Sequence, residues 1–196
     1  MGQFFTAYQT RIQATGVVIE ADGVHVAPST APYRVALVAH LPGNLNLGNH
    51  HIYVDMLDYN ERLAVNPSLK IGWTWVGRKD DEPAPCQPLD KTSPADTASG
   101  NIALGKGQVA SVWLQDGDKF ASNVVSGLST AISDADPATG NSLFHNSYYI
   151  VFAPRVGTVT EPTPQPIDCA ECQRQLTELR TRLDAITKLV NSWIGD

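Results

Sequence analysis

The stretch Lys70-Ile-Gly-Trp-Thr-Trp-Val76 is typical of a β-strand, because it concentrates β-branched and aromatic residues between turn-forming neighbours. Six other short runs share this composition and are bounded by Gly, Pro, Asn or Asp. We therefore expect seven strands, at Gln13–Glu20, Tyr33–Leu41, His51–Leu57, Lys70–Val76, Gln108–Leu114, Asn123–Leu128 and Ser147–Phe152.

These runs predict a mainly β fold, an antiparallel β-sandwich of the jelly-roll or immunoglobulin-like kind. No amphipathic helix of about 10 to 15 residues separates them, so βαβ units and a parallel sheet are not expected. Two long connections, Gly77–Ile102 and Ser129–Ser142, are where we expect contacts with a partner.

Composition places the chain among globular proteins. Of its 196 residues 42% are hydrophobic and 17% are charged. The net charge of −6 argues against a nucleic-acid partner, which demands a cationic surface. No apolar run approaches the roughly 20 residues that cross a bilayer, so no membrane partner is expected. The N-terminal MGQFFTAYQTRI lacks a basic segment followed by an apolar one, so we expect no secretory signal peptide.

A proline-rich segment and then a helix follow the strand-rich part. Prolines at alternate positions, Pro162, Pro164 and Pro166, forbid a helix and favour an extended spacer. Asp168 and Glu171 then have the spacing of a helix-starting capping box. We therefore expect a β-sandwich domain at 1–156, a linker at 157–167 and a coiled-coil oligomerisation helix at 168–196.

The tail CAECQRQLTELRTRLDAITKLVNSW, residues 169–193, keeps strict heptad spacing, as self-associating helices do. The a positions of this heptad seam are Cys169, Leu176, Leu183 and Val190, and the d positions are Cys172, Leu179, Ile186 and Trp193. Leucine at a followed by isoleucine at d shifts the preference from two helices to three or four. We therefore expect a parallel homotrimer, with a dimer as the second choice.

Cys169 and Cys172 open the heptad seam. They are small core side chains or interchain disulfides, and the disulfides fit best, since corresponding seam positions approach closely across a coiled coil. A zinc site would need more ligands than one chain supplies, although three chains could supply six thiolates at the axis. The third cysteine, Cys86, is either free or bridged to a neighbour. Disulfides without an export signal fit a virion, assembled in the cytosol and released by lysis into an oxidising medium.

We find no sequence signature of catalysis or of a cofactor. His51, Tyr53 and Asp55 alternate on one strand face, but residues four apart on a strand are separated by about 13 Å, too far to share a metal ion unaided. Motifs for hydrolases, zinc proteases and nucleotide binding are missing from the sequence. We therefore expect no catalytic, cofactor or metal residues, and no enzyme.

Trp73 and Trp75 share one side of their strand, and Trp113 lies on another strand. Aromatic side chains on a sheet face can stack on sugar rings. More often they belong to the core of a sandwich, where large aromatic residues dominate the packing. Trp73 and Trp75 are therefore candidate glycan contacts, with a core position as the alternative.

Three stretches of the chain are distinctive: Ile71–Pro85 with IGWTWVGRKDDEPAP, Gly100–Leu104 leading to Val109–Trp113, and Phe144–Phe152 with FHNSYYIVF. Together they resemble a small β-sandwich module of bacteriophage proteins and bacterial cell-wall-related proteins. The resemblance covers about residues 30–155 and excludes the coil. It implies a phage or surface setting, and it brings no catalytic residues with it.

Together these features predict a non-enzymatic structural protein of a bacteriophage virion, extracellular after lysis. It would be a homotrimeric capsid decoration or short fibre protein that contacts a capsid or other virion protein, and a cell-surface glycan is a further candidate partner. The alternative is a carbohydrate-binding module that anchors a phage or bacterial wall-associated assembly to glycan. A hydrolase with unrecognised carboxylates is the third option.

Overall fold

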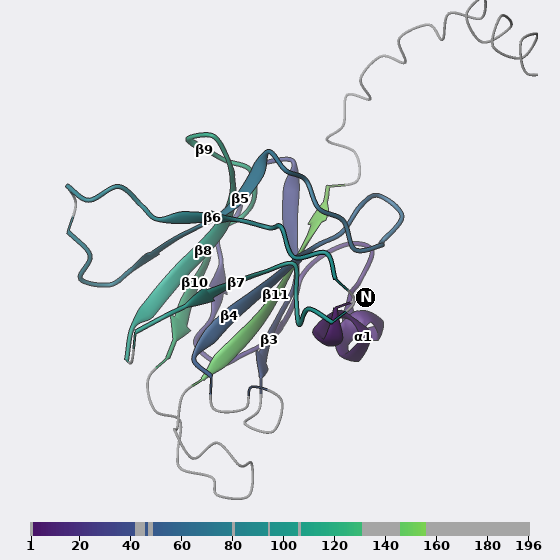
Figure 1. The fold of residues 1–196 in the computed structure, drawn as a ribbon, viewed down its shortest axis with the longest axis horizontal. Helices are drawn as coiled ribbons and strands as arrows, with labels where there is room; N and C mark the ends of the chain where they lie inside the picture. Colours follow the sequence, from purple (N-terminus) through teal and green to yellow (C-terminus); the bar gives the residue numbers. More distant parts are fainter. Residues whose placement is uncertain are drawn as a thin grey trace, which may run out of the picture. The chain divides into compact units, whose positions relative to one another are not determined.

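The computed structural model describes residues 2–41, 46, 49–79, 81–93, 95–105, 107–130 and 146–155. They form two β-sheets, with one short helix beside them (Figure 1). The prediction of a mainly β fold is therefore confirmed. The predicted linker at 157–167, the coiled coil at 168–196 and most of the connection Ser129–Ser142 lie outside the described residues.

Sheet A has five strands in the order β1-β3-β11-β4-β7. Their bounds are Val18–Glu20 (β1), Tyr33–Leu41 (β3), His51–Met56 (β4), Gly100–Ala103 (β7) and Ser147–Pro154 (β11). The pairs β3–β11 and β4–β7 are antiparallel, but β1–β3 and β4–β11 are parallel. Antiparallel pairing throughout was thus a wrong prediction for sheet A. Alternation along a strand specifies which side chains face the core, and it leaves the direction of the neighbouring strand open.

Sheet B has six strands. Five follow the order β2-β10-β8-β5-β6, and β9 pairs with β8. Their bounds are His25–Val26 (β2), Leu69–Trp75 (β5), Cys86–Pro88 (β6), Val109–Asp116 (β8), Lys119–Phe120 (β9) and Val125–Ser129 (β10). Every pair described in this sheet is antiparallel, as expected.

Six of the seven predicted strands appear within two residues of their expected ends. The exception is Gln13–Glu20, of which only Val18–Glu20 is a strand. Gly16 has a φ of 82°, which interrupts extended backbone. The Arg34 guanidinium also donates hydrogen bonds to the carbonyl oxygens of Gln13 and Ala14, each at 2.7 Å. At residues 13 and 14, contacts with the Arg34 side chain thus take the place of a strand ladder.

The connection Gly77–Ile102 is shorter than predicted. It contains β6 and the first residues of β7, which extend the two sheets. Both strands are only three or four residues long, and β6 includes two residues of low strand propensity beside Cys86. Runs this short lack the alternation by which a strand is recognised.

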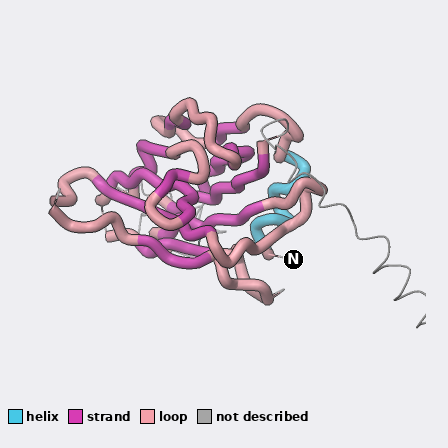
Figure 2. The backbone as a smooth tube through the Cα atoms, turned by 90° about the horizontal axis from the view of Figure 1, so that it is seen from above, coloured by secondary structure: helices cyan, strands magenta, loops and turns pink. Residues whose placement is uncertain are grey.

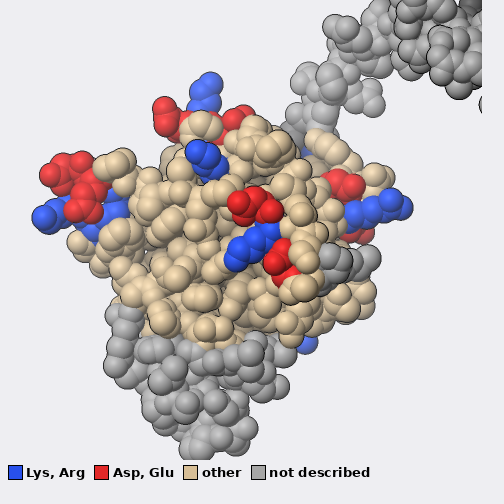
Figure 3. All heavy atoms as spheres, viewed as in Figure 1, with Lys and Arg blue, Asp and Glu red and all other residues tan. Residues whose placement is uncertain are grey.

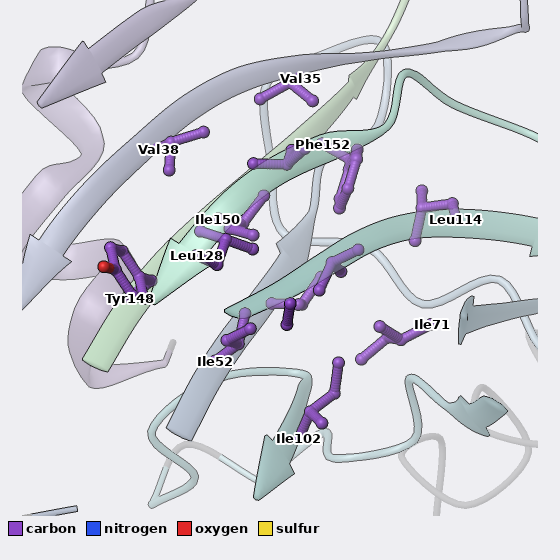
Figure 4. Close-up of a cluster of buried hydrophobic side chains, with 14 of the residues drawn as sticks. Val35, Val38, Ile52, Ile71, Ile102, Leu114, Leu128, Tyr148, Ile150 and Phe152 are labelled. Carbon is purple, nitrogen blue, oxygen red and sulfur yellow. The ribbon is translucent and has the colours of Figure 1, made fainter. Parts of the chain in front are cut away.

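The sheets pack against each other through an inter-sheet cluster of apolar side chains. Its buried members are Val24, Val35, Val38, Ile52, Val54, Met56, Leu69, Ile71, Leu89, Ile102, Leu104, Ala110, Val112, Leu114, Ala121, Val125, Leu128, Tyr148, Ile150 and Phe152. Figure 4 shows Ile150 and Phe152 of sheet A on one side of this cluster and Ile71 and Leu114 of sheet B on the other. Burying each such side chain contributes about 1.5–3 kcal/mol, so this layer stabilises the sandwich most.

A second apolar layer covers the opposite face of sheet A. Helix α1 (Gln3–Tyr8), followed by the 3₁₀ turn Gln9–Arg11, lies beside the strands (Figure 2). The outer cluster beneath it comprises Phe4, Phe5, Tyr8, Ala36, Leu37, Ala39, Leu41, Tyr53, Leu57, Ala98, Tyr149, Val151 and Ala153. Since both faces of the central strand β11 are covered, all eight of its residues are buried. A helix of six residues is too short to show helical periodicity, which is why the sequence did not predict it.

Candidate functional site

A hollow of about 370 Å³ lies beside the outer cluster, between two loops. Its apolar wall consists of Leu63, Ala64, Val65 and Ala98, and the remaining lining is formed by Gly2, Asp55, Lys91, Thr92, Ser93, Asp96 and Ser99. One loop follows β4 and the other precedes β7, so two neighbouring strands of sheet A position both walls. We treat this hollow as the candidate site, because pockets with an apolar wall and a few converging polar groups are where small molecules bind.

Asp55 lies beneath the hollow and is fully buried. Its Oδ1 accepts hydrogen bonds from the backbone N–H of Ser99 at 2.7 Å and from the Ser99 hydroxyl at 2.6 Å. Its Oδ2 accepts one from the Tyr149 hydroxyl at 2.6 Å. Three donors satisfy a buried carboxylate without a cationic partner. Asp55 therefore joins β4, β11 and the loop before β7.

The Tyr149 hydroxyl is held in its neutral form by this arrangement. Burial raises the pKa of Tyr149 far above its ordinary value, and the negative charge of Asp55 raises that pKa further. Tyr149 therefore acts as a permanent hydrogen-bond donor to Asp55 over the physiological pH range.

The same loop also holds the N-terminal helix. The backbone N–H groups of Gln3 and Phe4 donate to the carbonyl oxygens of Asp96 and Thr97, at 3.3 and 3.2 Å. The Phe4 ring packs edge-on against the Tyr53 ring, with centroids 4.8 Å apart. One wall of the hollow and the docking of α1 thus depend on the same backbone.

Local hydrogen bonds fix the shape of the polar wall. Asp96 Oδ2 accepts from the Ser93 N–H at 2.8 Å, and the Asp96 N–H donates to the Ser93 carbonyl at 2.9 Å. The Lys91 N–H donates to the Ser99 carbonyl at 3.0 Å, and its ammonium donates to Asn101 Oδ1. The loop is therefore pre-shaped before any ligand arrives.

His51, Tyr53 and Asp55 share one face of β4, but the structure does not bring them together as ligands. His51 Nδ1 lies 3.2 Å from the Tyr53 hydroxyl, whereas Asp55 contacts Ser99 and Tyr149. Burial lowers the pKa of His51, and the nearby His50 and Lys91 lower it further. Among the residues described, no group of three or more His, Cys, Asp or Glu side chains is placed to hold a metal ion.

Trp73 and Trp75 are both half-buried on β5. Trp73 packs against the inter-sheet cluster, as its core interpretation requires. Trp113 is 7% exposed and lies opposite Gly72, where a side chain would collide with its indole ring. The Trp113 ring also packs against that of Phe120, with centroids 5.1 Å apart. The three tryptophans therefore do not form one flat aromatic surface.

The remaining predicted site residues lie largely elsewhere in the chain. All eight residues of the heptad seam, including the disulfide candidates Cys169 and Cys172, are outside the described residues. Cys86 is described, and it is an exposed free thiol on β6.

The surface shows small groups of acidic and basic side chains separated by broad uncharged areas on the face in Figure 3. Within the described part of the chain, no helix is long and apolar enough to span a bilayer.

Sequence reasoning did not single out the hollow. One signal was present, because Asp55 interrupts the otherwise apolar run of β4, and a charge in a buried strand needs local partners. Its partners Ser99 and Tyr149 are 44 and 94 residues away, which no local pattern reveals. Comparison of the chain with protein-family models, with curated proteins and with solved structures finds no significant match, so the resemblance to phage and cell-wall modules stays a prediction.

Proposed function

We propose that this chain is a non-enzymatic structural protein of a bacteriophage particle, a homotrimeric capsid decoration or short fibre protein. The observation that carries this proposal is the unbroken heptad spacing of residues 169–193, which follows a proline-rich spacer. Heptads of this kind bring copies of a chain together, and the spacer allows each β-sandwich to reach its own contact.

The β-sandwich suits a role as a rigid contact head. Its central strand β11 is buried on both faces, between the inter-sheet cluster and the outer cluster. Three such heads on one coil would convert weak single contacts into strong attachment, provided that the geometry allows simultaneous binding. Disulfides at Cys169 and Cys172 would hold the start of the coil once the particle reaches an oxidising medium.

The oligomeric state of the full chain tests the proposal. Sedimentation equilibrium should give three times the 21.2 kDa mass of one chain. Replacing Leu179 and Ile186 together by aspartate places charges in the seam and should give monomers with an intact sandwich. The matched control replaces Thr177 and Thr181 by aspartate, which adds the same charge outside the seam and should leave the trimer.

Two outcomes would contradict the coil as the assembly element. If the wild-type chain is monomeric at micromolar concentration, the proposed trimer is refuted. A trimer that survives the seam aspartates would assign the interface to the sandwich. In purified particles, the copy number and the state of the Cys169 and Cys172 thiols, measured by non-reducing mass spectrometry, test the virion setting separately.

A carbohydrate-binding module is the second candidate function. It is favoured by the half-exposed state of Trp73 and Trp75, since partly exposed indole rings can stack on sugars. A glycan array should then show binding that Trp75→Ala removes while the fold persists. Binding that does not depend on either tryptophan would place a glycan elsewhere on the sandwich.

A further inference from the structure

We propose that the hollow above Asp55 binds one neutral, hexose-sized sugar unit of a glycan. The inference rests on the second candidate function, glycan binding, and is independent of the trimer. It assigns the binding site to the loops beside α1 instead of to Trp73 and Trp75.

The size and division of the hollow fit such a ligand. Its volume of about 370 Å³ falls at the lower end of the range for small-molecule pockets, about 300–1,000 Å³. Leu63, Ala64 and Val65 offer an aliphatic surface to the C–H face of a sugar ring. Thr92 and Ser93 also line the hollow, and their hydroxyls can both donate and accept hydrogen bonds.

The charges around the hollow favour a neutral ligand. Lys91 and Asp96 line the same rim with opposite charges. The Asp55 carboxylate already accepts three hydrogen bonds, so its charge does not require a cation. The Lys91 ammonium donates to Asn101, which lines a neighbouring hollow and not this one, and Asp96 Oδ2 accepts from the Ser93 N–H. The Thr92 and Ser93 hydroxyls, which can both donate and accept, and the Asp96 carboxylate are thus the polar groups offered to the vicinal hydroxyl groups of a sugar.

The hollow is also pre-shaped. The hydrogen bonds from Ser93 to Asp96 and from Ser99 to Asp55 hold the polar loop in place. Binding therefore costs little entropy for ordering this loop, and a single sugar unit can bind without rearrangement of the site. Trp73, by contrast, packs against the inter-sheet cluster.

The test uses the full-length chain, labelled with ¹⁵N and titrated with free glucose, galactose, mannose and N-acetylglucosamine. At least one sugar should shift the backbone amides of residues 91–93 and 95–99 and give saturation-transfer signals. Thr92→Val should weaken binding about tenfold, since it removes a hydroxyl-bearing side chain from the lining of the hollow at nearly constant volume. Val65→Trp should abolish it by filling the hollow. Lys70→Ala is the control, an exposed lysine outside the hollow, and should bind like wild type.

Several outcomes would overturn the assignment. Chemical shift changes that map to β5 and disappear in Trp75→Ala would support glycan binding but would refute the hollow as the binding site. Equal binding by Thr92→Val, Val65→Trp and wild type would refute it as well. Binding of phosphate or ammonium ions instead of any neutral sugar would refute the neutral ligand. No response to any of the four sugars at concentrations of tens of millimolar would refute this inference, while the trimer measured by sedimentation would stand unaffected.

Discussion

The two apolar clusters on either side of sheet A are built differently. The inter-sheet cluster is assembled from strands of both sheets, and most of its members are aliphatic. The outer cluster depends on a six-residue helix near the N-terminus, is rich in aromatic rings, and borders the buried carboxylate of Asp55. Tyr148 and Tyr149, adjacent on β11, point into the first and the second cluster respectively.

Because of this difference, we expect the two clusters to open in different ways. The inter-sheet cluster can be lost only by unfolding the sandwich. The outer cluster can open locally if α1 undocks, because the helix is held by backbone hydrogen bonds from Gln3 and Phe4, by the packing of three aromatic side chains and by the exposed Arg11–Glu20 ion pair of the following turn. The hollow borders this second, more local layer.

The largest effect is expected from a matched pair of phenylalanine truncations. Phe152→Ala, in the inter-sheet cluster, should reduce the free energy of unfolding by about 3–5 kcal/mol. Phe4→Ala should cost about half as much, because undocking of α1 limits the loss. Urea denaturation measures both values, and hydrogen exchange should show faster exchange of the α1 amides in Phe4→Ala alone. Equal costs would mean that the two clusters unfold as one unit.

Removing the buried carboxylate should have the next largest effect. Asp55→Ala leaves the N–H and hydroxyl of Ser99 and the hydroxyl of Tyr149 without their acceptor, and should cost about 3 kcal/mol. Asp55→Asn retains one carbonyl acceptor and should cost less. Chemical denaturation is the measurement. An Asp55→Ala variant as stable as wild type would show that the network does not stabilise the outer face of sheet A.

Two tyrosine-to-phenylalanine changes test the contrast on a single strand. Tyr149→Phe removes a hydrogen bond to a carboxylate and should cost about 2 kcal/mol, whereas Tyr148→Phe removes one to the neutral Ser129 carbonyl and should cost about 1 kcal/mol. Both rings remain buried, so packing is matched. Thermal or urea unfolding decides the order. A reversed order would contradict a charged network beneath the hollow.

The smallest effect concerns pH. Folding lowers the pKa of His51 below its ordinary value of 6.5. As the pH falls through 6.5, the unfolded chain therefore binds more protons at His51 than the folded protein does. His51 thus makes the fold less stable below about pH 6.5 than above it, and His51→Gln should reduce this dependence. Denaturation midpoints at pH 7.5 and pH 5.5 provide the comparison. An unchanged pH dependence in His51→Gln would assign the effect to other groups.

Much of the sandwich could be predicted because strand patterns are local. Tyr33–Leu41 was predicted with its observed ends, and β4, β5 and β8 differ by no more than two residues. The short strands β2, β6, β7 and β9 were missed, since two to four residues do not establish alternation. The candidate site could not be predicted, because its lining comes from segments around Gly2, Asp55, Leu63 and Ser93 that only folding brings together.

By itself, the sequence determined that this chain forms a mainly β domain, because alternating apolar residues must bury one side of each strand. It also determined the heptad spacing of residues 169–193, since that spacing is a property of the sequence alone. Only the tertiary structure decided that β4 and β11 run parallel and that α1 covers sheet A. It also decided that Asp55 meets Tyr149 across 94 residues. Such pairings depend on which distant segments exclude water together, and local patterns carry no information about that choice.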